Sequence, residues 1–179
     1  MGIEDKRALR RAVRARLELI DAVEARARSM AICKELEKHI ALGGATVVAL
    51  FSPLADEPQI WPVVERLAQK LSVVLPRVEG DVMNFYCYAR NGMAVGAFGI
   101  NEPQQGVPLQ PDEIDAIVVP GVAFTADGVR MGRGKGFYDR YLSQKGFAAL
   151  KIGVCYREQL VDDIPAEPHD VAMDVVIYK

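Results

Sequence analysis

The chain has 179 residues, of which 50% are hydrophobic and 26% are charged, and 22 basic against 24 acidic residues give a net charge of −2. This length and composition predict a single globular domain, residues 1–179, with a core large enough to fold without disulfides or structural metals. The nearly balanced charge argues against a protein whose whole surface attracts nucleic acid or membrane, so any basic site must be local.

Hydrophobic periodicity and capping residues predict an alternation of helices and strands. Leu9 and Val13 fall on one flank of the first helix, the pair Asp21 and Glu24 is typical of a helix N-terminus, and Gly43 suits a helix end. In chain order the predicted elements are helices at 4–20 and 21–41, a strand at 46–51, a helix from Pro58 to residue 70, strands at 71–76 and 82–89, a loop at 90–112, a strand at 114–121, a helix at 137–146, and strands at 151–156 and 171–178.

This alternation predicts a three-layer α/β/α fold, Rossmann-like, with a mainly parallel central sheet and helices on both faces. Two unusual loops, 52–58 and 122–136, each follow a core strand directly. Because ligands bind beyond the carboxyl ends of parallel strands, we expect both loops to lie at the same edge of the sheet.

The segment GVRMGRGKGFYDRYL at 128–142 combines glycines, cations and the start of a helix. Glycines let backbone N–H groups approach a ligand closely, and a following helix offers the positive end of its dipole. Arg130, Arg133 and Lys135 add positive charge, so the segment predicts a polyphosphate-binding loop. Its spacing matches neither the Walker motif nor the dinucleotide-binding motif, and a simple glycine-rich turn remains the alternative.

The longer segment VVPGVAFTADGVRMGRGKGFYDRYL strongly resembles the signature of the 5-formyltetrahydrofolate cyclo-ligases, also called methenyltetrahydrofolate synthetases. The basic N-terminal helix, DEP after the first strand, LPRV, NEP and the C-terminal PHD also follow in family order. Met131 stands where leucine is usual in the family. Phe137 stands where tyrosine is usual, so a hydroxyl is absent there while the ring is kept.

The resemblance implies an enzyme, a ligase that forms a C–N bond. It would use ATP and Mg²⁺ to convert 5-formyltetrahydrofolate into 5,10-methenyltetrahydrofolate, ADP and phosphate. In the family's mechanism the γ-phosphoryl group passes to the formyl oxygen, N10 of the folate attacks the activated carbon, and phosphate leaves. Phosphoryl transfer depends on positioning and charge stabilisation, so no Ser–His or Cys–His pair is required.

The resemblance also assigns individual residues. Arg133 and Lys135 are the implied catalytic residues, and Asp139 and Asp170 are the implied magnesium ligands. The implied ATP-binding residues are Lys6, Arg10, Arg130, Gly132, Arg133, Gly134, Lys135, Gly136, Phe137 and Tyr138. The implied folate-binding residues are Glu57, Phe98, Arg133, Gly134, Lys135, Gly136 and Phe137.

Each of these assignments has a structural alternative. Asp139 suits the first turn of any helix, Asp170 is an ordinary loop acid when taken alone, Glu57 could be a surface acid, and Phe98 could belong to the core. The first helix carries its cations within an arc of about 140°, a pattern typical of a solvated face. These cations are Lys6, Arg7, Arg10, Arg11 and Arg14. Three further residues are predicted to be structural or surface residues: His39, Trp61 and His169.

Two other functions remain open at this point. The protein could be a diverged relative that binds nucleotide or folate without the activity, or a nucleic-acid-binding module that uses the basic helix. Lys135 and the carboxylates of Glu57, Asp139 and Asp170 favour the enzyme over the diverged relative, and the slightly acidic net charge disfavours the nucleic-acid-binding module. We expect small-molecule substrates, a monomer, and no nucleic-acid or membrane partner.

The cysteines and the N-terminus predict a cytoplasmic protein. Cys33, Cys87 and Cys155 are isolated and odd in number, which favours a reducing compartment and gives no metal-ligand spacing. The basic N-terminus lacks the apolar segment of a signal peptide, its acidic residues argue against a transit peptide, and no apolar run is long enough to cross a bilayer.

Overall fold

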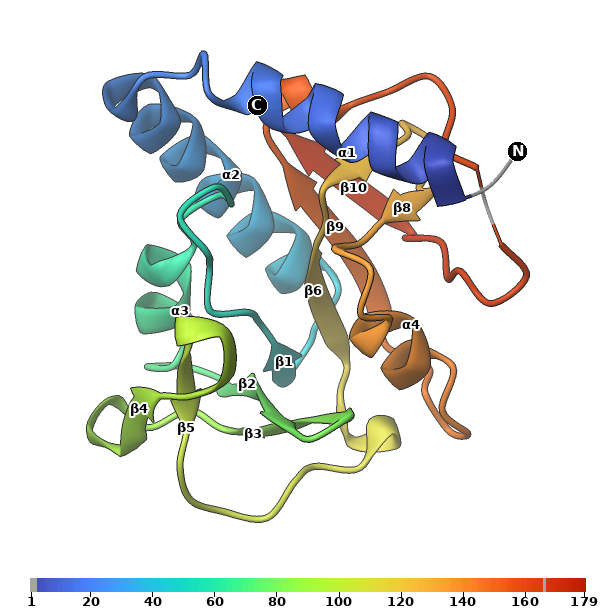
Figure 1. The fold of residues 1–179 in the computed structure, drawn as a ribbon. Helices are drawn as coiled ribbons and strands as arrows, with labels where there is room; N and C mark the ends of the chain where they lie inside the picture. The colour runs from blue at the N-terminus through green and yellow to red at the C-terminus, as the bar shows by residue number, and fades with distance from the viewer. Residues whose placement is uncertain (1–2, 166) are drawn as a thin grey trace.

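The computed structural model describes residues 3–165 and 167–179, and its centre is a six-stranded sheet with the order β10-β9-β6-β1-β2-β3 (Figure 1). The strands are β1 (Val47–Ala49), β2 (Ser72–Glu79), β3 (Val82–Cys87), β6 (Ala116–Pro120), β9 (Leu150–Cys155) and β10 (Val175–Tyr178). Neighbouring strands are parallel, except that β2 and β3 form an antiparallel hairpin. The predicted, mainly parallel sheet is therefore confirmed.

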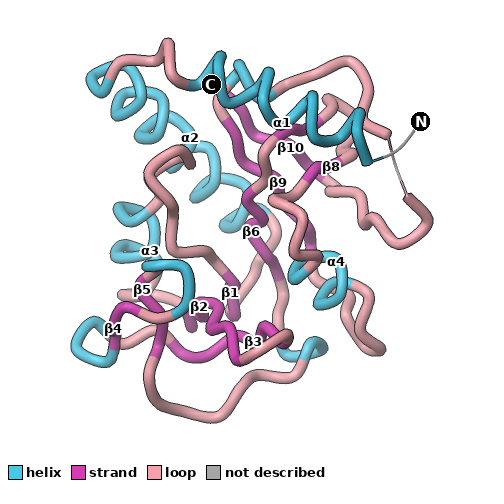
Figure 2. Tube along the Cα trace, in the orientation of Figure 1, coloured by secondary structure: helices cyan, strands magenta, loops and turns pink. Residues whose placement is uncertain are grey.

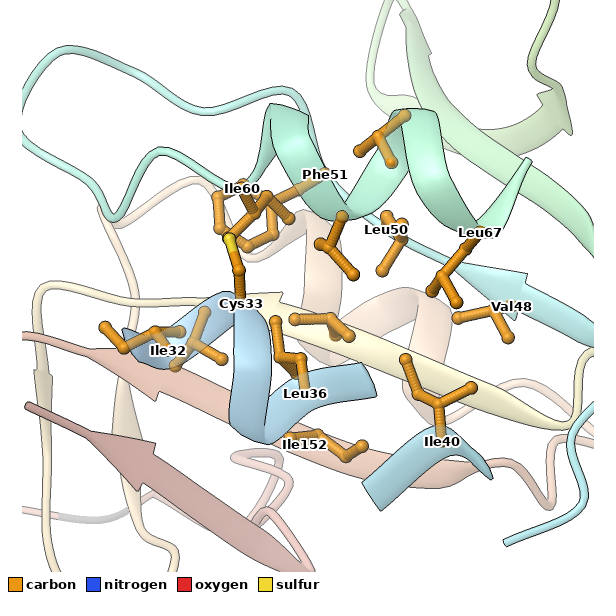
Figure 3. Close-up of a cluster of buried hydrophobic side chains, with 14 of the residues drawn as sticks. Ile32, Cys33, Leu36, Ile40, Val48, Leu50, Phe51, Ile60, Leu67 and Ile152 are labelled. Carbon is orange, nitrogen blue, oxygen red and sulfur yellow. The ribbon is translucent and has the colours of Figure 1, made fainter. Parts of the chain in front are cut away.

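One face of the sheet is covered by α2 (Ala22–Leu42) and α3 (Trp61–Leu67). Ile32, Leu36 and Ile40 recur at helical spacing along α2 and are almost completely buried. They pack with Val48 of β1 and with apolar residues of α3, as Figure 3 shows. This packing of a helical stripe on a parallel strand is the larger core of the molecule.

The opposite face is covered by α4 (Phe137–Leu142). Ala49 and Phe85 belong to this second core, and the ring of Tyr141 meets that of Phe85 edge-on, with 4.8 Å between centroids. Successive side chains of a strand point to opposite faces, so Val48 packs towards α2 while its neighbour Ala49 packs towards α4. Burial on both faces explains why the central strands are almost entirely apolar.

Helix α1 (Ile3–Leu17) lies across one end of the sheet, where Figure 2 shows it above β8. It packs on a small hairpin of β7 (Ala123–Phe124) and β8 (Arg130–Met131), and Val13 is fully buried in that contact. Among residues 3–165 and 167–179, neither this helix nor any other is both long and apolar enough to span a membrane.

The local predictions differ from the structure in a few places. Helix α3 begins at Trp61 and not at Pro58, because Pro62 occupies the first turn, where its missing N–H is not needed. Helix α4 ends at Leu142, short of residue 146. The predicted loop 90–112 contains an antiparallel pair, β4 (Met93–Val95) and β5 (Asn101–Pro103). The described part of the chain also contains four short 3₁₀ helices: η1 (Arg90–Gly92), η2 (Ala97–Gly99), η3 (Pro111–Glu113) and η4 (Arg157–Gln159).

The strand order creates a crevice between β1 and β6. These strands are neighbours in the sheet, yet β1 is followed by α3 on one face and β6 by α4 on the other. Chain connections that leave adjacent strands towards opposite faces open a ligand site at their carboxyl ends. The 52–58 loop follows β1 and the glycine-rich loop follows β6, so both reach this crevice, as the sequence predicts.

The ring of Phe124 lies between two glycines, and this contact can be tested. A Cβ on Gly153 would lie 2.6 Å from Phe124 Cε1, and one on Gly121 would lie 2.7 Å from Phe124 Cζ. We expect Gly153→Ala to lower the free energy of unfolding by about 1–3 kcal/mol through overpacking, measured by urea denaturation. Gly92→Ala is the control, because its Cβ would meet only Ala89 Cβ at 3.5 Å. Equal losses in the two variants would contradict the packing argument.

Candidate active site

A cavity of about 740 Å³ opens at the carboxyl ends of β1 and β6. Every residue that the family resemblance assigned to ATP, folate, catalysis or magnesium lines this cavity. These residues come from α1, the loop after β1, the turn at η2, the glycine-rich loop, α4 and the loop before β10. The fold thus brings together residues far apart in the sequence, in a space large enough for drug-sized ligands.

Arg130 lies behind the glycine-rich loop with only 3% of its side chain exposed. Its Nη2 donates to Asp139 Oδ2 at 2.8 Å, and its Nη1 donates to the backbone oxygen of Pro120 at 3.2 Å. The guanidinium therefore joins the end of β6 to the first turn of α4. Removal of either partner would leave a buried charge unpaired, so substitution of Arg130 or Asp139 should lower the stability of the fold.

The structure explains why glycine is required at three positions of the loop. A Cβ on Gly132 would lie 2.9 Å from Arg130 Nη1, so this glycine makes room for the buried guanidinium. Gly134 and Gly136 have φ angles of 102° and 66°, which only glycine adopts without strain. The glycine spacing therefore serves the loop's own packing as well as any approach of a phosphate to its backbone.

Arg133 forms an ion pair with the other unusual loop. Its Nε and Nη2 donate to Glu57 Oε1 at 3.1 and 3.0 Å, and Nη2 also donates to Asp56 Oδ1 at 2.6 Å. Glu57 is buried, with 5% of its side chain exposed, and its Oε2 accepts from the Leu54 N–H at 2.9 Å. Burial raises the pKa of Glu57, while the Leu54 N–H and Arg133 favour its charged form. The residues predicted to contact the two substrates are thus direct neighbours.

Two cations of the basic helix are engaged inside the site. Lys6 Nζ, largely buried, lies 3.0 Å from Asp170 Oδ2 and 3.3 Å from Glu167 Oε2. Arg10 Nε donates to the backbone oxygen of Gly132 at 3.1 Å. Arg7 also lines the cavity, whereas Arg11 is exposed and is not among the described residues that line it. The solvated-face alternative therefore holds for Arg11 and fails for Lys6.

Asp139 and Asp170, the predicted magnesium ligands, lie on adjoining segments. Asp139 Oδ1 accepts from the Val171 N–H at 3.4 Å, which places this carboxylate beside the residue that follows Asp170. Although burial opposes it, the Glu167 N–H and Lys6 hold the pKa of Asp170 below its usual range. Oxygen donors of this kind suit Mg²⁺, so the pair fits the predicted metal, with Arg130 and Lys6 as its present counter-charges.

A second group of possible ligands includes one of these acids. Ligand atoms of Glu167, His169 and Asp170 lie within 4.8 Å of one another. The Lys6 ammonium contacts both carboxylates of this group and already neutralises much of their charge. His169 has 70% of its side chain exposed, as predicted for a surface residue, yet it lines the cavity.

Part of the cavity's lining is an apolar wall formed by Phe98, Phe137, Met83 and Val78. Phe98 is 59% exposed, so the core alternative for this ring is wrong. Its backbone has φ 59° and ψ 17°, an unfavourable conformation for a bulky residue and one that is common at functional sites. The ring lies 6.2 Å from that of Phe137 between centroids, and Met83 and Val78 continue the wall. Such a surface suits a flat ring.

Sequence reasoning missed several residues of the cavity. Glu102 is only 4% exposed, lines the cavity, and accepts a hydrogen bond from the Val78 N–H at 3.3 Å. The NEP motif that contains this acid contributes to the family resemblance but predicts no role for Glu102. Glu167 was also missed, although it lies in the same short segment as Asp170. A buried acid on a short strand has no sequence signal apart from such a motif.

The cysteines give the site no nucleophile. Cys33 and Cys155 are buried, and burial raises the pKa of both thiols, that of Cys155 to about 12. Neither lines the cavity among the described residues, and Cys87, which is exposed, does not line it either. Reactivity requires the thiolate, so the site depends on hydrogen-bonding and charged groups instead.

Comparison with known proteins decides the family. The profile of the 5-formyltetrahydrofolate cyclo-ligase family matches residues 2–179. This chain belongs to that family. The resemblance found in the glycine-rich segment is therefore confirmed, and the family is named for a ligase.

Individual relatives agree with this assignment. A 5-formyltetrahydrofolate cyclo-ligase of Mycolicibacterium smegmatis is 35% identical over 145 residues, which cover 76% of this chain and 74% of that protein. The enzyme of that name from Mus musculus is 24% identical over 189 positions, with 97% and 93% coverage.

Solved structures of family members have the same fold. The NMR structure of Aquifex aeolicus 5,10-methenyltetrahydrofolate synthetase superposes with a TM-score of 0.86 and 34% identity, covering 97% of this chain and 89% of that one. The Mycoplasma pneumoniae 5,10-methenyltetrahydrofolate synthetase gives 0.79 and 27% identity, with 97% and 98% coverage. The α/β architecture of this cyclo-ligase family member is thus shared with its relatives.

The bridge made by Arg130 can be tested by a substitution that keeps its charge. We expect Arg130→Lys to lower the free energy of unfolding by about 1–3 kcal/mol, because an ammonium cannot reproduce the fork that reaches both Pro120 and Asp139. Urea denaturation measures this loss. Arg66→Lys, in an exposed ion pair with Glu37, is the matched control and should change stability by less than about 1 kcal/mol. If the two variants are equally stable, Arg130 does not hold the loop.

Proposed function

We propose that this protein catalyses the ATP- and Mg²⁺-dependent cyclisation of 5-formyltetrahydrofolate to 5,10-methenyltetrahydrofolate, with release of ADP and phosphate. The observation that carries the proposal is the common cavity, in which the residues assigned to ATP and those assigned to the folate lie side by side. Glu57, assigned to the folate, is in hydrogen-bond contact with Arg133, which is assigned to both substrates. A group transferred between two substrates requires this kind of proximity.

The cations that line the cavity suit the triphosphate. Lys6 and Arg10 of α1 and Lys135 of the glycine-rich loop are among them, and the loop's glycines have no side chain that would keep a phosphate from the backbone. Lys6 and Arg10 contact the site's own loops, which disfavours the alternative of a nucleic-acid patch on this helix. Charge-assisted hydrogen bonds to phosphate are the stronger kind, so a few such groups suffice for binding.

Other residues of the same cavity suit the folate. Glu57 can accept hydrogen bonds from the N–H groups of a pterin, because an ionised carboxylate is an acceptor only. Phe98 and Phe137 line the same cavity and offer aromatic rings for the flat ring system. A pterin held there leaves its N5 formyl group free to approach Arg133 and Lys135.

In this arrangement the residues of the chain stabilise charge and hold geometry. The formyl oxygen attacks the γ-phosphorus as ADP departs, and N10 of the folate then attacks the formyl carbon, loses its proton and expels phosphate. Arg133 and Lys135 would neutralise the negative charge on the transferring group and on the departing phosphate. Neither step uses a covalent bond to the protein.

Asp139 and Asp170 would hold Mg²⁺ together with phosphate oxygens, the sparse coordination that this ion commonly has in nucleotide sites. The ion would neutralise charge on the polyphosphate when bound. We expect the protein to act as a monomer in the cytoplasm on these small molecules, without a nucleic-acid or membrane partner.

The activity itself is the first test. Purified protein given 5-formyltetrahydrofolate and Mg-ATP should form the methenyl product, followed by its absorbance, with about one phosphate released per product because each cyclisation consumes one γ-phosphoryl group. Omission of ATP, or chelation of magnesium, should abolish product formation. Product that forms equally well without ATP would overturn the proposal.

Kinetics can separate the role of Glu57 in folate binding from the role of Lys135 in phosphoryl transfer. We expect Glu57→Gln to raise the folate KM about ten-fold or more with the ATP KM nearly unchanged, because its NH₂ would face pterin donors and leave them unpaired. Lys135→Met removes charge near the transferring phosphoryl group, so kcat should fall more than folate affinity. Steady-state measurements against both substrates distinguish these effects. A wild-type folate KM in Glu57→Gln would show that the DEP loop does not bind the pterin.

A further inference from the structure

Arg133 and Glu57 raise a question about the bound state. The guanidinium assigned to the transferring phosphoryl group is bonded to the carboxylate assigned to the folate. Glu57 Oε2 already accepts from the Leu54 N–H, while Oε1 takes two N–H groups of Arg133. A pterin that donates to Glu57 in the cavity therefore competes with Arg133 for Oε1. When a pterin takes Glu57 Oε1, the Arg133 side chain becomes mobile unless another residue holds it.

Asp56 is in the right place to hold Arg133. Its Oδ1 lies 2.6 Å from Arg133 Nη2, the shortest of the three contacts between Arg133 and the 52–58 loop. Glu57 lines the main cavity, whereas Asp56 is not among the described residues that line it and has 40% of its side chain exposed. A ligand in the cavity thus competes for Glu57 and leaves the Asp56 carboxylate to Arg133.

We infer that Asp56 is a positioning residue that keeps Arg133 beside the reacting groups while Glu57 binds the folate. The inference rests on the proposed function and adds a residue to which that function gave no role. Arg133 carries five N–H donors, and release from Glu57 frees Nε and part of Nη2 for phosphate oxygens. The remaining contact with Asp56 limits how far the guanidinium can move, so its fork stays pre-organised for the phosphoryl group.

This arrangement couples the two substrates. When the folate binds Glu57, Arg133 is free to bind the nucleotide. When the nucleotide binds Arg133, Glu57 Oε1 is free to bind the folate. Coupling between two sites is reciprocal, so each ligand should increase the affinity for the other by the same factor. We expect a factor of about five or more, the lower part of the range typical of coupled sites. The coupling depends on Asp56. Without that contact, an Arg133 side chain released from Glu57 would be mobile and would add less to the affinity for the nucleotide.

The test measures the affinity for a non-hydrolysable ATP analogue, by calorimetry in the presence of Mg²⁺, with and without saturating 5-formyltetrahydrofolate. Asp56→Asn keeps the size of the side chain and removes its charge. Without folate it should bind the analogue within about two-fold of wild type, since Glu57 still holds Arg133. With folate, the wild-type increase of about five-fold or more should be largely lost, and Asp56→Glu should restore part of it. Glu37→Gln, in an ion pair outside the cavity, is the matched control and should keep the full increase.

Catalysis provides a second readout. In Asp56→Asn we expect kcat to fall about five-fold or more while the folate KM changes little, whereas loss of a merely structural contact in the loop would raise the folate KM. A double-mutant cycle with Arg133→Ala decides the cause, because Asp56→Asn should have no further effect on kcat once Arg133 is absent. An undiminished effect in that background, or an unchanged increase in nucleotide affinity in Asp56→Asn, would overturn the inference.

The two proposals fail in different ways. Wild-type protein that forms no product from 5-formyltetrahydrofolate and Mg-ATP would contradict the proposed function and, with it, the role of Asp56. Wild-type turnover together with normal kcat and normal coupling in Asp56→Asn would contradict the role of Asp56 alone.

Discussion

The geometry of the site depends on one buried guanidinium. Arg130 bridges the end of β6, at Pro120, and the first turn of α4, at Asp139, so the chain between them must pass closely around it. Gly121 and Gly132 have no side chains where a Cβ would meet Arg130 at 3.1 and 2.9 Å. Close packing around Arg130 therefore accounts for part of the glycine content of this segment. The hydrogen bonds of Arg130 fix the two ends of the segment that carries Arg133 and Lys135.

Several of the charged side chains that line the cavity form ion pairs with one another. Lys6 pairs with Asp170, Arg130 with Asp139, and Arg133 with Glu57, all with little exposure of the acids. A free polyphosphate would have to compete with these acids for their cations, and the acids would lose their partners. A polyphosphate that arrives with a divalent cation removes this conflict, because the cation supplies the carboxylates with a new counter-charge. If the protein binds ATP as proposed, this pairing predicts tighter binding of Mg-ATP than of the bare nucleotide.

Periodicity was sufficient to predict the order of the main elements, the mainly parallel sheet and the common edge of the two loops. It failed for β4–β5 and β7–β8, because strands of two or three residues contain no measurable period. The residues alone predicted a polyphosphate loop around Arg130, Arg133 and Lys135, while the assignments of Glu57 and Asp170 came from the family resemblance. The ion pair between Glu57 and Arg133 joins segments separated by 76 residues, and only tertiary packing determines such a contact.

Phe137 shows how the chain can depart from its family's pattern without losing the apolar wall that this residue forms with Phe98. The Phe98 ring is exposed on a strained backbone, an arrangement that adds little to folding and is more easily explained by a ligand that covers it. Phe137 keeps the ring that faces Phe98, and Arg140 lies over it at 5.2 Å from the centroid, held in turn by the backbone oxygens of Lys135 and Asp81. These contacts use the face and edge of the ring and none requires a hydroxyl. The replacement of tyrosine by phenylalanine therefore leaves the shape of the apolar wall intact, and any effect on the reaction must come from a hydrogen bond to the ligand.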